Sequence, residues 1–160
     1  MGRFCHSGRI RKRLVTAVPA GALLADTGFW YGFLDPKDQH HKSAQSQAYY
    51  LEKFQIIVPW PTLYETVGTR LVKKRDQIQA FDRILKRRNI VFLEDENYRD
   101  NALELALESA ILGKRPVSLV DMTLRLILAD PNVRIRGLLT FNVRDFHDVC
   151  RQEKIEILTS

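Results

Sequence analysis

The chain has 160 residues, of which 45% are hydrophobic and 28% are charged. This length and composition are typical of one globular domain with a real core, and they exclude an intrinsically disordered chain. No apolar run is long enough to predict a transmembrane helix, so the sequence gives no reason to expect a membrane protein.

The formal net charge of +6 is unevenly distributed. Residues 1–14 carry five basic side chains and no acidic one, which leaves 20 basic and 19 acidic side chains in the rest. We therefore predict a basic, flexible N-terminal arm over residues 1–20 and a nearly neutral folded domain over residues 21–160. The short apolar stretch in the arm superficially resembles a signal peptide, but Pro19 and Gly21 interrupt it, which favours an extension. Cys5 and Cys150 form no disulfide framework, and this predicts a reduced, cytoplasmic setting.

Strand-like and helix-like segments alternate along the chain. A strand over residues 22–25 precedes a helix over 27–34, a break at 35–38 and a helix over 40–54. Then come a strand over 55–58 closed by Pro59 and Pro61, a helix carrying Glu65, a helix over 77–88 and a strand over 90–93. Helices over 98–112 and 118–129 lead to strands over 135–140 and 155–158. This alternation predicts right-handed crossovers and a doubly wound α/β fold with a parallel sheet.

Acidic residues occupy the positions where such a sheet binds ligands. Asp26 directly follows the first predicted strand, and Asp145 follows the fourth. If these strands are neighbours at the switch point of the sheet, both ends open into one crevice. Asp121 lies in a mostly apolar helix, where a lone carboxylate would be desolvated unless it is paired or bound to a metal. Together with Glu65, these residues predict a site for a divalent cation.

Each acid also has a purely structural interpretation. Asp26 could be a helix N-cap, Glu65 part of an exposed helix face, Asp121 part of a capping box, and Asp145 a turn partner of Asn142. These interpretations explain every acid separately, but they do not explain why the four would converge.

Five segments of the sequence carry a family resemblance. They are Leu23–Thr27 around Asp26, Thr62–Thr66 around Glu65, Ser118–Asp121, Leu139–Phe146, and residues 35–44 after the first strand and helix. The first four, in chain order, resemble the PIN-domain ribonucleases, and residues 35–44 resemble VapC-like toxins in particular. The resemblance spans residues 22–158 and leaves only the arm outside.

The resemblance implies a five-stranded parallel sheet in the order 3-2-1-4-5, a Mg²⁺ or Mn²⁺ site, and hydrolysis of RNA. It places Asp26, Glu65 and Asp121 as the acids of the metal site. At the fourth position we favour Asp145 as the acid and Asn142 as a polar helper. It also implies an antitoxin protein as a candidate partner and, as in several such domains, a candidate homodimer.

The chemistry of these residue types agrees with that implication. Mg²⁺ prefers oxygen ligands, and a bound divalent ion activates water and stabilises charge on a phosphate. Thr27 and Thr140 could orient the ligands, or they could simply be β-branched residues at strand ends. Arg70, Lys73 and Lys74 begin a basic run that could contact RNA phosphates, or could form a solvated helix face.

Two other classes of function compete with the nuclease. A phosphohydrolase with Asp26 as nucleophile would usually need a second acid two residues later, where the chain has Gly28. A non-catalytic nucleic-acid or protein-interaction module could keep the fold and the basic arm, but it would not need Asp121 in an apolar helix. We therefore favour the nuclease.

Overall fold

The structure is a computed structural model that describes residues 21–68, 70–113 and 115–159. The predicted arm, residues 1–20, lies outside the described residues. The strands are β1 (Ala22–Ala25), β2 (Ile56–Pro59), β3 (Ile90–Leu93), β4 (Ile135–Leu139) and β5 (Glu156–Leu158). The helices are α1 (Thr27–Leu34), α2 (His41–Ser46), α3 (Ala48–Lys53), α4 (Trp60–Gly68), α5 (Arg75–Leu85), α6 (Arg99–Leu112), α7 (Leu119–Ala129) and α8 (Val143–Glu153).

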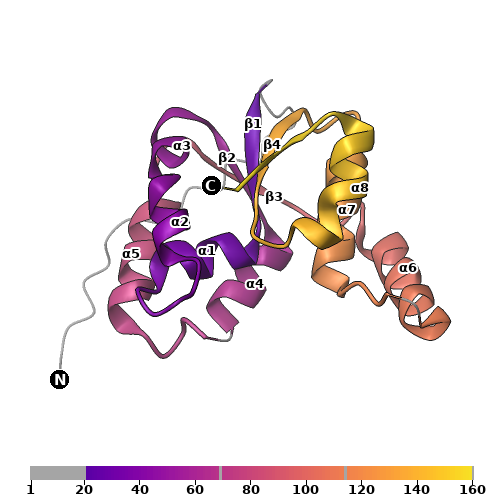
Figure 1. Cartoon of the computed structure of the whole chain (residues 1–160), viewed down its shortest axis with the longest axis horizontal. Coiled ribbons are helices and arrows are strands. Elements are labelled where there is room, and N and C mark those ends of the chain that lie inside the picture. Colours follow the sequence, from indigo (N-terminus) through magenta and orange to yellow (C-terminus); the bar gives the residue numbers. More distant parts are fainter. Residues whose placement is uncertain (1–20, 69, 114, 160) are drawn as a thin grey trace.

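The five strands form one parallel sheet in the order β3-β2-β1-β4-β5. This confirms the predicted doubly wound α/β fold and its strand order. Helices α1, α2, α3 and α5 lie on one side of the sheet, and α7 and α8 lie on the other, with α6 outside α7 (Figure 1). The crossovers bring the carboxyl ends of β1 and β4 together at the point where the strand order reverses.

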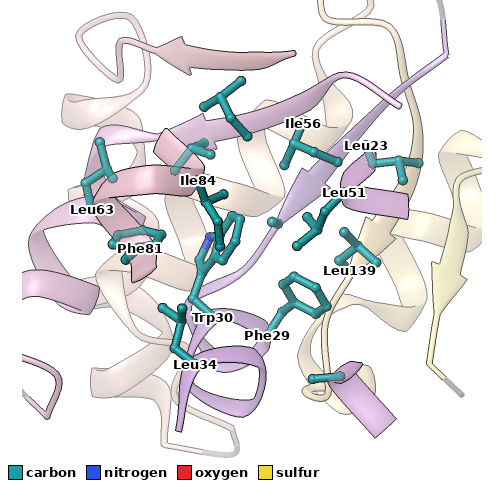
Figure 2. Close-up of a cluster of buried hydrophobic side chains, with 14 of the residues drawn as sticks. Leu23, Phe29, Trp30, Leu34, Leu51, Ile56, Leu63, Phe81, Ile84 and Leu139 are labelled. Carbon is teal, nitrogen blue, oxygen red and sulfur yellow. The ribbon is translucent and has the colours of Figure 1, made fainter. Parts of the chain in front are cut away.

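The alternation of side chains along β1 explains why both faces are covered. Leu23 and Ala25 are buried on the face that packs against α1 and α5, whereas Leu24 is buried on the face that packs against α7 and α8. Figure 2 shows the first cluster, in which the rings of Trp30 and Phe81 are in contact with centroids 5.1 Å apart. A strand that is buried on both faces reads as a continuous apolar run, as it does here.

The structure corrects the prediction in two places. The predicted helix over residues 40–54 is two short helices, because Gln47 leaves helical geometry between α2 and α3. The α2 segment buries only Ala44, so packing gives it little reason to continue as one regular helix. Helix α8 was not predicted, although Phe146, Val149 and Cys150 have the spacing of a buried helix face.

Small shifts affect the remaining elements. Pro59 is the last residue of β2, and Pro61 lies in the first turn of α4, where proline is well tolerated. Helix α5 covers residues 75–85 and not 77–88. Among the described residues, no helix is long and apolar enough to cross a membrane.

Gly137 in the central strand β4 leaves no room for a side chain, and this generates a test of the fold. A Cβ atom there would lie 3.0 Å from Leu158 Cδ1, 3.0 Å from Leu23 Cδ2 and 3.2 Å from the Glu156 carbonyl oxygen. Gly137→Ala should lower the free energy of unfolding by about 1–3 kcal/mol, as overpacking does in other cores. Urea denaturation measures this change.

Gly68→Ala is the matched control, because a Cβ atom at Gly68 meets nothing within 4 Å. That variant should be as stable as the unchanged protein or slightly more stable. Equal stability of the two variants would contradict the packing described for β4.

Candidate active site

Asp26 lies at the carboxyl end of β1, where the chain turns into α1. Its backbone N–H donates to the Leu139 carbonyl oxygen at 3.0 Å, which continues the pairing of β1 with β4. The Thr140 hydroxyl donates to Asp26 Oδ2 at 2.8 Å, and both side chains are buried. The sheet therefore fixes Asp26 and Thr140 side by side at the switch point.

The Asp26 carboxyl group is only 4% exposed, and its protonation reflects that burial. Its pKa is raised from 3.8 to about 7, mainly by desolvation and in smaller part by the negative charges of Asp121 and Glu65. Hydrogen bonds from Thr140 and from the backbone of Thr27 act in the opposite direction. Asp26 is thus poised between its neutral and charged forms near neutral pH.

Glu65 reaches the same region from α4. The Thr27 hydroxyl donates to Glu65 Oε2 at 2.7 Å, and the Tyr31 hydroxyl donates to the Glu65 carbonyl oxygen at 3.0 Å. These bonds link the first two turns of α1 to α4. The two predicted supporting threonines therefore each bond one predicted acid. Thr140 donates to Asp26, and Thr27 donates to Glu65.

Asp121 lies in the first turn of α7 and is half-buried. Its backbone N–H donates to Ser118 Oγ at 3.0 Å, so the N-cap part of the structural interpretation holds. Its pKa is raised, first by burial and then by the charges of Asp145 and Glu65, while Ser118 and Arg125 oppose the rise. The Asp121 carboxylate therefore contacts the capping residue Ser118 and also lies near the charges of Asp145 and Glu65.

Asp145 lies in the first turn of α8 and makes two side-chain contacts. The Asn142 amide donates to Asp145 Oδ2 at 2.8 Å, which is the predicted turn partnership. Arg115 donates to Asp145 Oδ1, also at 2.8 Å. Sequence reasoning missed Arg115, because an ion pair between residues 30 positions apart leaves no periodic pattern in the sequence.

The four predicted acids come from four different elements but share one charged neighbourhood. Asp121 is the centre of this neighbourhood, because it repels Asp26, Glu65 and Asp145 alike. Within the described part of the chain, however, no group of three or more His, Cys, Asp or Glu side chains is arranged to hold a metal ion. The role of these acids as metal ligands therefore stays a prediction.

The donor set suits a hard divalent cation such as Mg²⁺. All four side chains offer oxygen atoms, and the pKa values of Asp26 and Asp121 are raised first by burial and then by neighbouring acids, effects that a bound cation would offset. Mg²⁺ keeps several waters and needs only one or two protein carboxylates, so it does not require the four acids to close around it.

Two of the three predicted RNA-contacting cations already have acidic partners. Arg70 pairs with Asp38 at 2.8 Å, and its guanidinium carbon lies 4.7 Å from the centroid of the Tyr31 ring. Lys74 pairs with the buried Asp35. Lys73 is exposed. Because Tyr31 also bonds Glu65, Arg70 lies at the rim of the acidic neighbourhood.

The other reactive side chains have partners other than the four acids. His40 stacks on Phe141 with ring centroids 4.4 Å apart, and His41 Nδ1 is 2.8 Å from the Gly32 carbonyl oxygen. Cys150 is a free, buried thiol on α8 whose pKa is raised to about 11 by burial. A buried thiol that stays protonated at neutral pH is a poor nucleophile.

Comparisons with known proteins bear on the fold. No protein-family model matches the chain, and no curated protein matches it either. A solved structure similar to it is Mycobacterium tuberculosis VapC20, a sarcin–ricin loop cleaving toxin, with 18% identity and a TM-score of 0.59. The match covers 79% of this chain and 95% of VapC20.

A second similar structure is PAE2754 from Pyrobaculum aerophilum, with 19% identity and a TM-score of 0.50. That match covers 94% of this chain and 92% of PAE2754. At these identities the similarity establishes a shared fold and nothing further. It confirms that the chain shares the fold of VapC20, as expected from the resemblance of its sequence to VapC-like toxins.

The raised pKa of Asp26 predicts how stability depends on pH in metal-free buffer. The unfolded chain ionises Asp26 above about 3.8, whereas the folded chain keeps the proton until about 7. The contribution of Asp26 to stability is therefore fully present below pH 3.8. It is lost progressively as the pH rises from 3.8 to about 7. Its slope is at most about 1.4 kcal/mol for each pH unit.

Asp26→Asn should remove this loss, so its stability relative to the unchanged protein should rise from pH 4 to pH 7 and then level off. Chemical denaturation in EDTA at several pH values measures the difference. The control is Glu52→Gln, an exposed position on α3 that should show no such trend. A pH-independent difference between Asp26→Asn and the unchanged protein would contradict the ionisation described here.

Proposed function

We propose that this chain is a metal-dependent endoribonuclease that hydrolyses RNA phosphodiester bonds with Mg²⁺ or Mn²⁺. The observation that carries the proposal is the mutual repulsion of Asp26, Glu65, Asp121 and Asp145 at the switch point of a parallel sheet. Burial and the neighbouring acids raise the pKa values of Asp26 and Asp121, although Arg115 pairs with Asp145 and Arg125 opposes the rise at Asp121, and carboxylates perturbed in this way favour a functional site.

The side chains of this chain would divide the work. Asp26, Glu65, Asp121 and Asp145 would hold the ion, which when bound supplies charge stabilisation to the attacked phosphate and a more acidic water molecule. Thr140 fixes the orientation of Asp26, and Thr27 fixes that of Glu65. Such positioning matters, because small displacements of ligands weaken both metal binding and catalysis.

RNA is a polyanion, so the acidic neighbourhood needs a basic rim to attract it. Of the three predicted cations, Arg70 is the best placed for that role, because it rests on Tyr31, which bonds the backbone of Glu65; the exposed Lys73 follows three residues later. Lys74 is less suited, because its charge is used by the buried Asp35. RNA phosphates would compete with Asp38 for Arg70.

The finer part of the proposal is that the chain is the toxin of a toxin–antitoxin pair in the cytoplasm. It is supported by the fold shared with VapC20, which is a toxin that cleaves the sarcin–ricin loop. A small DNA-binding protein encoded immediately upstream would favour this role over that of a housekeeping nuclease. A homodimer remains a separate proposal within this one.

The competing function is a non-catalytic module that binds RNA or protein with the same fold. Such a module would have no need for Asp121 beside Asp145 and Glu65. The two functions differ in one observable: only the nuclease loses RNA cleavage, and not RNA affinity alone, when one acid is neutralised.

Asp26→Asn and Asp121→Asn should each abolish cleavage of a labelled RNA while the far-ultraviolet circular dichroism spectrum stays unchanged. The loss is expected because each substitution removes one negative ligand but keeps the shape of the side chain. EDTA should abolish cleavage by the unchanged protein, and excess Mg²⁺ or Mn²⁺ should restore it. Gel electrophoresis of the products measures these rates.

Glu52→Gln is the matched control and should cleave at the normal rate. His40→Ala should also retain activity, because His40 is engaged with Phe141 and not with the acids. Undiminished cleavage in EDTA would refute the metal-dependent mechanism.

A further inference from the structure

A cavity of about 530 Å³ lies beside the acidic neighbourhood, between α4, α6 and α7. Its wall is mainly apolar and includes Pro61, Tyr64, Leu103, Leu119 and Val120, with Glu65 on the side of the acids. None of the functions assigned above to the acids uses this cavity. Its size falls in the range of cavities that bind small organic ligands.

We propose that this cavity binds one unpaired nucleobase of the RNA, from the nucleotide next to the phosphate held at the acidic neighbourhood. The inference rests on the proposed function and names the feature of the substrate that the site would recognise: a base that is splayed out of a single-stranded or looped RNA segment. The shared residue Glu65 makes the cavity continuous with the acids.

Tyr64 is the side chain that points to a base. It is 63% exposed although it belongs to the cavity wall, and its ring rests against Trp60 with centroids 5.6 Å apart. An exposed aromatic ring with a second ring behind it is a firm stacking platform. Proteins read unpaired RNA by stacking splayed bases on such side chains.

A charged group opposite the acids fits the rest of a nucleotide. Arg99 lines the cavity from α6, and Asp95 fixes its guanidinium through bonds of 3.0 Å and 2.8 Å. The Arg99 side chain is still 55% exposed, so it can also meet a phosphate. A base in the cavity would thus have Glu65 on one wall and Arg99 on another, with Asp95 and Asp100 beside Arg99.

The rival occupant is a protein surface, since α6 carries further exposed apolar residues. Leu107, Ile111 and Leu112 are exposed and do not line the cavity, whereas Leu103 and Leu119 are exposed and do line it. The first three lie on α6, which is outermost on its side of the sheet (Figure 1). A protein partner would cover this outer stripe, whereas the space of about 530 Å³ beside Glu65 suits a compact planar group.

The test measures RNA binding without cleavage, by fluorescence anisotropy of a labelled single-stranded oligoribonucleotide with proteins that carry Asp26→Asn. Tyr64→Ala should weaken binding about 5- to 100-fold, the factor that base–aromatic stacking contributes. Tyr64→Phe should bind normally, because it keeps the ring. Tyr49→Ala is the matched control, since Tyr49 is 58% exposed on α3 and lies outside the cavity.

A series of oligoribonucleotides with one abasic position each sharpens the test. Removal of the base at one position should lower the affinity of the protein that keeps Tyr64. Removal of the same base should not lower the affinity of the Tyr64→Ala protein any further. Equal affinities of the Tyr64→Ala and Tyr49→Ala proteins would overturn the inference. A change in oligomeric state of Tyr64→Ala by light scattering, with RNA affinity unchanged, would overturn it in favour of a protein interface.

Failure of this inference and failure of the proposed function are distinguishable. If the unchanged protein cleaves RNA but Tyr64→Ala binds RNA as well as Tyr49→Ala does, the nuclease stands and the base site does not. If Tyr64-dependent binding occurs in a protein that never cleaves RNA, the base site stands and the nuclease does not. A protein with no affinity for RNA would refute both.

Discussion

Repulsion among carboxylates at the carboxyl ends of β1 and β4 is the constraint on which the rest of this structure depends. Burial and the charges of Asp121 and Glu65 make ionisation of Asp26 unfavourable without an added positive charge. A proton can supply that charge near neutral pH, and so can a divalent cation. Hydrogen bonds hold three of the acids in place: Thr140 bonds Asp26, Thr27 bonds Glu65, and Asn142 bonds Asp145.

The parallel sheet produces this arrangement through its topology. Because β1 and β4 are neighbours while their crossovers run in opposite directions along the sheet, the ends of both strands open into one place. Helix α4 brings Glu65 to it from one side, and α7 brings Asp121 from the other. The same two helices, with α6, line the cavity to which Tyr64 belongs. The proposed base site therefore depends on the same helices that position Glu65 and Asp121.

The sequence predicted the parts of the structure that depend on local pattern. The apolar run that ends at Asp26, the cap at Ser118 and the partnership of Asn142 with Asp145 are short-range features, and the structure contains them all. It did not predict the contact of Arg115 with Asp145, which arises only when distant segments meet. The sequence analysis did not predict helix α8, although its buried residues have helical spacing. The break at Gln47 follows α2, which buries only Ala44.

The most direct test of the central claim is a ¹³C NMR titration of the Asp26 carboxyl carbon, with and without Mg²⁺, assigned by comparison with Asp26→Asn. Without Mg²⁺ the carboxyl group should titrate with a pKa of about 7, because burial and the neighbouring acids oppose its ionisation. Added Mg²⁺ should lower that pKa, because a bound cation favours the charged form. A pKa near the ordinary value of 3.8, or a titration that Mg²⁺ leaves unchanged, would contradict the account.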